Sequence, residues 1–248
     1  MLSQLHKTVT TRFDERVQKL IVNRYEELAT TLNTHENIIN DEEQLSSDIE
    51  NKSTAAETSS TPEHVDEKYI MVFDVEHTGC TDAHILQLSW GLYKRDGNLI
   101  ETKDYFLKLS KHIFIHPRAI EKHKITCEVL LQKTNTLELT ELLKQFTTDV
   151  SRCETLVAHN VKCDLKTLNN ELFRNNMSEL NASTYCTMAQ SKTFCNSKDK
   201  RGSMKFPTLN ELHQKLFNVP MDSTQAHNSC YDVEICAKCY FKYINMNI

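Results

Sequence analysis

The sequence lacks an apolar run long enough to span a membrane as a helix, which takes about 20 residues. It also lacks an apolar N-terminal run of the secretory type. Its nine cysteines are odd in number and scattered, which is not the pattern of a disulfide framework. These absences predict a soluble protein with no membrane partner, whose cysteines stay reduced in the cytoplasm or the nucleus.

The negative charge of the chain is concentrated in one segment. The formal net charge is −5 over 248 residues, yet residues 33–67 hold ten Asp or Glu against Lys52 alone. This segment is also poor in large apolar residues, so it is predicted to be a flexible acidic linker. From Lys68 onward the net charge is +3, which favours a polyanionic ligand.

Residues 1–32 carry apolar side chains at every third or fourth position, from Leu2 to Leu32. This spacing predicts an amphipathic N-terminal helix. Such a helix packs either on its own domain or on another chain, which would be a protein partner or a second copy of this one. The sequence leaves both possibilities open.

Residues 68–248 have the pattern of one domain built from strands and helices. Strands are predicted at 69–73, 85–93, 99–109, 155–158 and 183–186. Helices are predicted at 117–121, 127–132, 139–150, 165–173, 208–217 and 229–244. Asp96-Gly97 is typical of a hairpin turn between the second and third strands. The pattern predicts an α/β fold with a mixed sheet, in which the apolar first strand is central.

Two carboxylates, Asp74 and Glu76, stand where the first strand ends. Residues i and i+2 of a strand point to the same face, so these side chains project together and repel each other. A divalent ion that prefers oxygen ligands, such as Mg²⁺ or Mn²⁺, relieves that repulsion. Asp164 and Asp232 lie in segments that enter helices near the same edge, so four carboxylates can converge there.

Four acidic ligands suit two divalent ions about 3.5 to 4 Å apart, an arrangement used for in-line attack on a phosphodiester. The reaction also needs a base that titrates near neutrality. His227, five residues before Asp232, can reach the site without occupying a ligand position.

Three stretches of the chain carry these groups: residues 73–79 (Phe-Asp-Val-Glu-His-Thr-Gly), 159–164 and 227–232. In order and spacing they resemble the three motifs of the DEDDh family, the proofreading-subunit and RNase T-like 3′→5′ exonucleases. Residues 115–117, 123–126, 186–188 and 205–212 also look like family segments. The resemblance covers residue 68 to the C-terminus.

The resemblance implies an RNase H-like mixed five-stranded sheet flanked by helices. It also implies two Mg²⁺ or Mn²⁺ ions and release of nucleoside 5′-monophosphates from single-stranded 3′ ends of DNA or RNA. The implied metal ligands, which are also catalytic, are Asp74, Glu76, Asp164 and Asp232, and the implied general base is His227. The implied substrate-binding residues are His77, Thr78 and Asn160. Asn228 stands where a sister class has a catalytic tyrosine, which favours the histidine class.

Three positions depart from the family pattern. His77 stands where Thr is usual, which can alter the grip on the terminal nucleotide. Cys163 stands where a large aromatic residue packs, which can loosen Asp164. Ser229 stands where Ala is common.

Three further features have a structural and a functional interpretation. His159 is interpreted as a structural turn residue rather than a catalyst. Cys236 and Cys239 have the spacing of a zinc or redox pair, but no second matched pair accompanies them, so core thiols are favoured. The basic residues of 192–205 either follow a phosphate backbone or are simply solvated.

A second functional hypothesis comes from another class. It takes the chain as a weakly active or inactive exonuclease fold that serves as a nucleic-acid-binding or protein-interaction module. The intact set of four carboxylates favours the enzyme.

Overall fold

The computed structural model describes residues 68–79, 82–109 and 113–246. The predicted N-terminal helix (1–32) and acidic linker (33–67) lie outside the described residues. The strands are β1 (Tyr69–His77), β2 (Ile85–Tyr93), β3 (Leu99–Phe106), β4 (Cys153–Ala158) and β5 (Thr184–Cys186). The longer helices are α4 (Leu139–Ser151), α5 (Val161–Arg174), α8 (Leu209–Phe217) and α9 (Ser229–Ile244). The shorter ones are α2 (Pro117–His123), α3 (Cys127–Gln132), α6 (Thr187–Gln190) and α7 (Lys192–Cys195).

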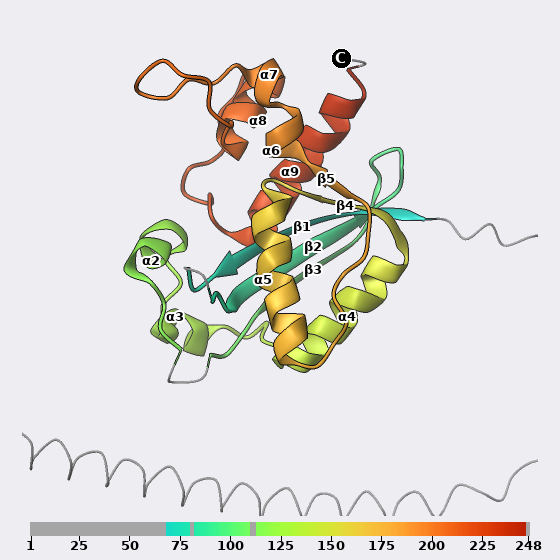
Figure 1. Cartoon of the computed structure of the whole chain (residues 1–248), viewed down its shortest axis with the longest axis vertical. Coiled ribbons are helices and arrows are strands. Elements are labelled where there is room, and N and C mark those ends of the chain that lie inside the picture. Colours follow the sequence, from blue (N-terminus) through green and yellow to red (C-terminus); the bar gives the residue numbers. More distant parts are fainter. Residues whose placement is uncertain (1–67, 80–81, 110–112, 247–248) are drawn as a thin grey trace, which may run out of the picture. The chain divides into compact units, whose positions relative to one another are not determined.

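The five strands form one mixed sheet in the order β3-β2-β1-β4-β5. β1 is antiparallel to β2 and parallel to β4, so it occupies the centre. This confirms the predicted α/β fold with a mixed sheet and a central first strand. In Figure 1, α5 crosses one face of the sheet and α9 lies at the other.

β1 is central because both of its faces are apolar. Met71, Phe73 and Val75 pack on one face, in a cluster to which α4 and α5 also contribute. Ile70 and Val72 point to the opposite face, where they pack against residues of α9. A strand that is buried on both faces has a continuous run of apolar residues, rather than apolar residues that alternate with polar ones.

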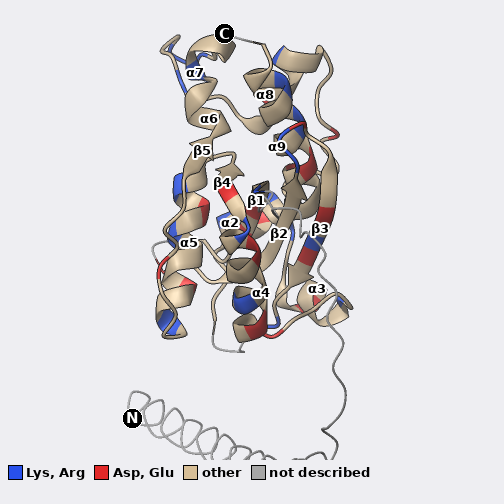
Figure 2. Cartoon of the chain, turned by 90° about the vertical axis from the view of Figure 1, so that its right-hand side faces the viewer, with Lys and Arg blue, Asp and Glu red and all other residues tan. Residues whose placement is uncertain are grey.

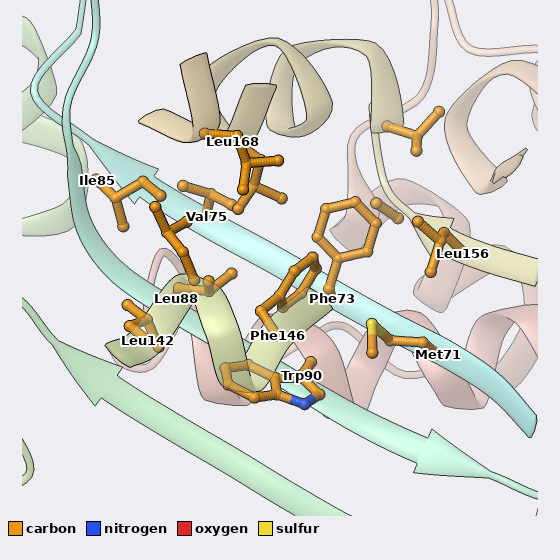
Figure 3. Close-up of a cluster of buried hydrophobic side chains, with 14 of the residues drawn as sticks. Met71, Phe73, Val75, Ile85, Leu88, Trp90, Leu142, Phe146, Leu156 and Leu168 are labelled. Carbon is orange, nitrogen blue, oxygen red and sulfur yellow. The ribbon is translucent and has the colours of Figure 1, made fainter. Parts of the chain in front are cut away.

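Aromatic rings form the middle of the larger cluster (Figure 3). The ring of Phe146, on α4, lies edge-on to Phe73 at 5.7 Å and to Trp90 at 5.3 Å between centroids. Edge-to-face pairs of this kind add to the free energy gained by burial alone. Together they hold α4 and β1 at a fixed distance.

Some boundaries differ from the sequence prediction. β1 runs on to His77 because β2 pairs with it through Gln87 and Ile85, although the last residues of β1 are polar. β3 ends at Phe106 rather than at Leu109, and the N–H of Phe106 donates to the carbonyl of Asn135. The polar segment that begins at Lys192 opens with a short helix, α7.

Cys236 and Cys239 are buried on α9, in two different apolar clusters. This confirms that they are core thiols. Among the helices that the structure describes, none has both the length and the apolarity required to cross a bilayer.

Candidate active site

A cleft of about 740 Å³ opens where β1 ends, and the carboxylates of Asp74 and Glu76 line it. These two side chains continue the face of β1 that Ile70 and Val72 form further back. α2 lies beyond the end of β1 (Figure 1) and supplies one wall of the cleft. The first turns of α5 and α9 and the segment that enters α8 supply the others.

Asp164 reaches the cleft from the first turn of α5. The chain leaves β4 and turns at Asn160, whose φ of 86° is left-handed, before the helix begins at Val161. An asparagine tolerates this conformation better than most residues. The turn brings Asp164 back toward β1, where it accepts a hydrogen bond from the backbone of Val75.

The start of α9 is anchored to the sheet by a buried polar network. The Asn228 side chain caps the helix by accepting from the N–H groups of Cys230 and Tyr231. Ser229, fully buried, shares a 2.5 Å hydrogen bond with the hydroxyl of Ser89 on β2, and its N–H donates to Gln87. Serine, where the family commonly has alanine, therefore adds a hydrogen bond to the sheet.

This anchoring directs Asp232, in the first turn of α9, into the cleft. One of its oxygens, Oδ2, accepts from the N–H of His227 at 3.2 Å. His227 has a left-handed φ of 65° and also lines the cleft. Ligand atoms of Glu76, His227 and Asp232 lie within 4.8 Å of one another.

The four carboxylates perturb one another strongly. Burial, followed by the charges of Asp164, Glu76 and Asp232, raises the pKa of Asp74 well above its ordinary value. Burial and the charges of Asp232 and Asp164 raise the pKa of Glu76 to about 8. Burial also raises the pKa of Asp164 to about 8 and that of Asp232 to about 6, against hydrogen bonds from the backbone. Such a cluster is stable in its charged form only with compensating positive charge.

The carboxylate oxygens of the cleft are suitable ligands for a divalent cation. Within the described part of the chain, two buried carboxylate oxygens, Asp164 Oδ2 and Asp232 Oδ1, have no hydrogen-bond partner. An orphaned buried acceptor is costly unless something else satisfies it. Carboxylate oxygens are the ligands that Mg²⁺ and Mn²⁺ prefer, so the cleft can hold a metal of this kind.

The sequence profile of the RNase T exonuclease family matches residues 71–240, which is more than half of the chain. The chain belongs to this exonuclease family. All four carboxylates and His227 lie inside the matched region. A comparison with curated proteins finds no match.

Among solved structures, the exonuclease domain is similar to E. coli Exonuclease I. The complex of that protein with a dA16 oligonucleotide is 13% identical, with a TM-score of 0.60 over 72% of this chain and 41% of that chain. Its complex with a dT13 oligonucleotide is 15% identical, with the same TM-score and coverage. An apo form of Exonuclease I is 14% identical, with a TM-score of 0.61 over 72% of this chain and 42% of that chain.

This chain thus spans about two fifths of the length of Exonuclease I. At such low identity the likeness establishes the fold. The sheet and its flanking helices have the RNase H-like exonuclease fold that the sequence predicted.

Two of the three predicted substrate-binding residues of the exonuclease domain line the cleft, namely His77 and Asn160. The ring of His77 accepts a hydrogen bond from the N–H of Gly79 through Nδ1, and Nε2 lies 3.8 Å from the sulfur of Cys163. Burial and the charge of Lys122 lower the pKa of His77, so its ring is neutral near pH 7. Because Nδ1 accepts a hydrogen bond, the ring hydrogen lies on Nε2.

Thr78, the third predicted substrate-binding residue, does not line the cleft. It is 2% exposed, and its hydroxyl accepts from the N–H of His84 at 2.9 Å. This hydrogen bond ties the end of β1 to the start of β2. Contact with substrate stays a prediction for all three residues.

His159 has both ring nitrogens engaged. Nδ1 lies 2.9 Å from the hydroxyl of Thr187, and Nε2 donates to the carbonyl of Pro207 at 3.1 Å. Burial lowers its pKa to about 4, although the bond to Pro207 acts in the opposite direction. A neutral histidine held at both ends agrees with the structural role predicted for it.

Sequence reasoning missed three residues that line the cleft. Arg118 and Lys122 bring positive charge from α2, and Phe206 brings an aromatic ring from the segment before α8. The segment 205–212 resembles a family segment, but the resemblance implies no role for Phe206. For the two cations no sequence signal was available, because their approach to β1 depends on how α2 packs.

Proposed function

We propose that the chain is a metal-dependent 3′→5′ exonuclease of the DEDDh type. It would release nucleoside 5′-monophosphates from single-stranded 3′ ends of DNA or RNA. The observation that carries the proposal is the convergence of four carboxylates from β1, α5 and α9, with an imidazole beside them, in one cleft.

The carboxylates would hold the metal. Asp74, Glu76, Asp164 and Asp232 supply oxygen ligands in the cleft, and Asp164 and Asp232 each have a buried oxygen still to be satisfied. Two bound divalent ions would lower the pKa of a water molecule and stabilise the leaving oxygen.

His227 would act as the general base. Burial and the charges of Lys122 and Lys124 lower its pKa, so its ring is neutral near pH 7 and can accept a proton. It would take that proton from the attacking water, whose oxygen forms a bond to the terminal phosphorus. The bond from phosphorus to the 3′-oxygen breaks, which frees the nucleotide, and the 3′-oxygen takes a proton from solvent to become the 3′-hydroxyl of the shortened strand.

Positive charge in the cleft supports a polyanionic substrate. Arg118 and Lys122 face the acidic end of β1 from α2. Along α5 and α9, by contrast, acidic and basic residues are interspersed (Figure 2). The proposed substrate class also agrees with the oligonucleotides that Exonuclease I holds in its structures.

The proposal is tested by replacing one metal ligand. End-labelled single-stranded DNA and RNA are incubated with the full chain in Mg²⁺, Mn²⁺ or EDTA, and shortened products are resolved. Asp74→Asn is expected to lower the rate more than about 100-fold, since even groups that only orient metal ligands are worth about 10- to 100-fold. Asp96→Asn, the same change at an exposed turn outside the cleft, is the matched control.

Wild-type products should form a ladder that shortens from the 3′ end and is absent in EDTA. Binding without any ladder in either metal would instead support the hypothesis of an interaction module. A wild-type rate in Asp74→Asn would remove the proposed mechanism.

A further inference from the structure

A phenylalanine side chain is exposed inside the cleft. Phe206 is 50% exposed and lines the same hollow as the carboxylates. Apolar surface is more stable away from water, so an exposed aromatic ring in a functional cleft calls for a ligand that covers it. Met188 and Leu209 line the cleft as well, so this wall is apolar whereas the α2 wall is basic.

The ring of Phe206 carries a cation on one face. The ammonium group of Lys192, at the start of α7, lies 4.5 Å from the ring centroid. This is the distance of a cation–π contact, which orients the ring and places a positive charge beside it. With this contact in place, half of the residue's surface is still exposed to solvent.

The segment that carries Phe206 is held on both sides. Before it, Lys205 pairs with both oxygens of Glu211 at 2.8 Å. After it, the carbonyl of Pro207 accepts from the partly buried ring of His159. Thr208 then closes a capping box with Glu211 at the start of α8. The ring is therefore exposed on a fixed frame, which lowers the entropy that binding a ligand would cost.

We propose that Phe206, with Lys192 over its ring, is a stacking platform for a base of a single-stranded nucleic acid. This inference rests on the proposed function, because the strand is one whose 3′ end lies at the carboxylates. The base covers the exposed surface of the ring, and Lys192, Arg118 and Lys122 offer positive charge to the phosphates.

This platform would distinguish single-stranded from duplex nucleic acid, but not one base sequence from another. Every base has a π-face, so stacking tolerates all four bases and both sugars. In a duplex each base is already paired and stacked, and it must be unpaired before it reaches the ring. Phe206 is thus a specificity-determining residue for single strands over duplex ends.

The test measures binding without hydrolysis. Fluorescein-labelled 12-mers of dT and of U, and a blunt DNA duplex, are titrated with the full chain in EDTA at low salt. Phe206→Ala is expected to weaken single-strand binding about tenfold and to leave duplex binding unchanged. Phe206→Trp restores an aromatic surface and should restore binding, whereas Phe206→Leu, which keeps an apolar side chain, should not.

Phe173→Ala is the matched control, because Phe173 is 83% exposed on α5 and does not line the cleft. Its binding should equal that of the wild type. The inference is overturned if Phe206→Ala binds single strands as the wild type does, if the leucine variant binds as well as the tryptophan variant, or if the wild type binds no single strand.

These outcomes are separate from those of the proposed function. A chain that binds single strands through Phe206 but produces no ladder in Mg²⁺ or Mn²⁺ keeps the platform and loses the catalytic proposal. A chain that produces a ladder, while its Phe206→Ala variant binds single strands normally, keeps the catalytic proposal and loses the platform.

Discussion

Two residues that line the cleft have left-handed backbone conformations, which residues other than glycine rarely adopt. Asn160 has a φ of 86° and His227 a φ of 65°, and each lies just before a helix that carries a carboxylate. Such conformations cost about 1 to 3 kcal/mol and persist where the surrounding structure enforces them. Here they turn the chain so that Asp164 and Asp232 face β1.

The role of His227 leads to a prediction for its replacement. His227→Ala is expected to lower kcat about 10²- to 10⁴-fold, because the proton of the attacking water would lose its acceptor. The rise in thermal stability that Mn²⁺ causes should remain, since the four carboxylates are unchanged. Steady-state kinetics and thermal unfolding with and without Mn²⁺ measure the two effects.

His213→Ala serves as the control, because His213 is half-buried on α8 outside the cleft, where its ring contacts Phe217 and the carbonyl of Val219. If His227→Ala loses the Mn²⁺ effect together with activity, His227 is a metal ligand rather than the base. The His227 ring lies close enough to Glu76 and Asp232 to bind a metal together with them, so the experiment distinguishes the two roles.

Among the elements, α4 is attached to the sheet by a buried ionic cluster. Asp149 accepts hydrogen bonds from Trp90 at 2.9 Å, Lys103 at 2.8 Å and Arg152 at 2.9 Å. Burial by itself raises the pKa of Asp149, but these hydrogen bonds and the charge of Lys103 outweigh it and hold the pKa below its usual value. The cluster therefore favours the charged carboxylate and fixes the end of α4 against β2 and β3.

Asp149→Asn is expected to lower the free energy of unfolding by about 1 to 3 kcal/mol at pH 7, because the ion pairs are lost. The folded-state pKa of Asp149 lies below its ordinary value of 3.8, so the unfolded state binds more protons and stability rises with pH. The contribution is complete above the ordinary pKa and disappears as pH falls through the folded-state value. Urea unfolding from pH 7 down to about pH 3 measures it.

The difference between the wild type and Asp149→Asn should therefore shrink as the pH falls below about 4. Glu141→Gln, on the exposed side of α4, should change stability by less than about 0.5 kcal/mol. A difference that stays constant with pH would mean that packing, rather than charge, makes Asp149 important.

At the scale of the whole molecule, the acidic cluster opposes folding at the point where β1, α5 and α9 meet. In EDTA the wild type is expected to be less stable than Asp74→Asn, which removes one of the repelling charges. Mn²⁺ should stabilise the wild type by about 2.7 kcal/mol when its concentration is 100 times the Kd. For a domain of this size that is a rise in Tm of about 5 °C or more.

The measurement is thermal unfolding of the full chain, with NaCl at equal ionic strength as the control for screening. Asp74→Asn should gain little from Mn²⁺. The account of the cluster is contradicted if Asp74→Asn is the less stable protein in EDTA.

Local patterns were sufficient for most of the fold. Alternation and apolar runs located the five strands, and the central place of β1 followed from its apolar residues on both faces. Thr208 and Glu211 form the capping box that their spacing predicted. The start of α5 escaped prediction because it depends on the left-handed turn at Asn160, which an apolar periodicity does not register.

The sequence by itself determined which groups the chain can bring to a site: four carboxylates, an imidazole, and the strand and helices that carry them. These follow from side-chain chemistry and from spacing, which are local properties. Only the tertiary structure decided that Lys122 and Phe206 share the cleft with them, because that placement depends on how α2 and the segment before α8 pack across the sheet. Contacts between distant segments arise from the packing of whole elements, and no local pattern encodes them.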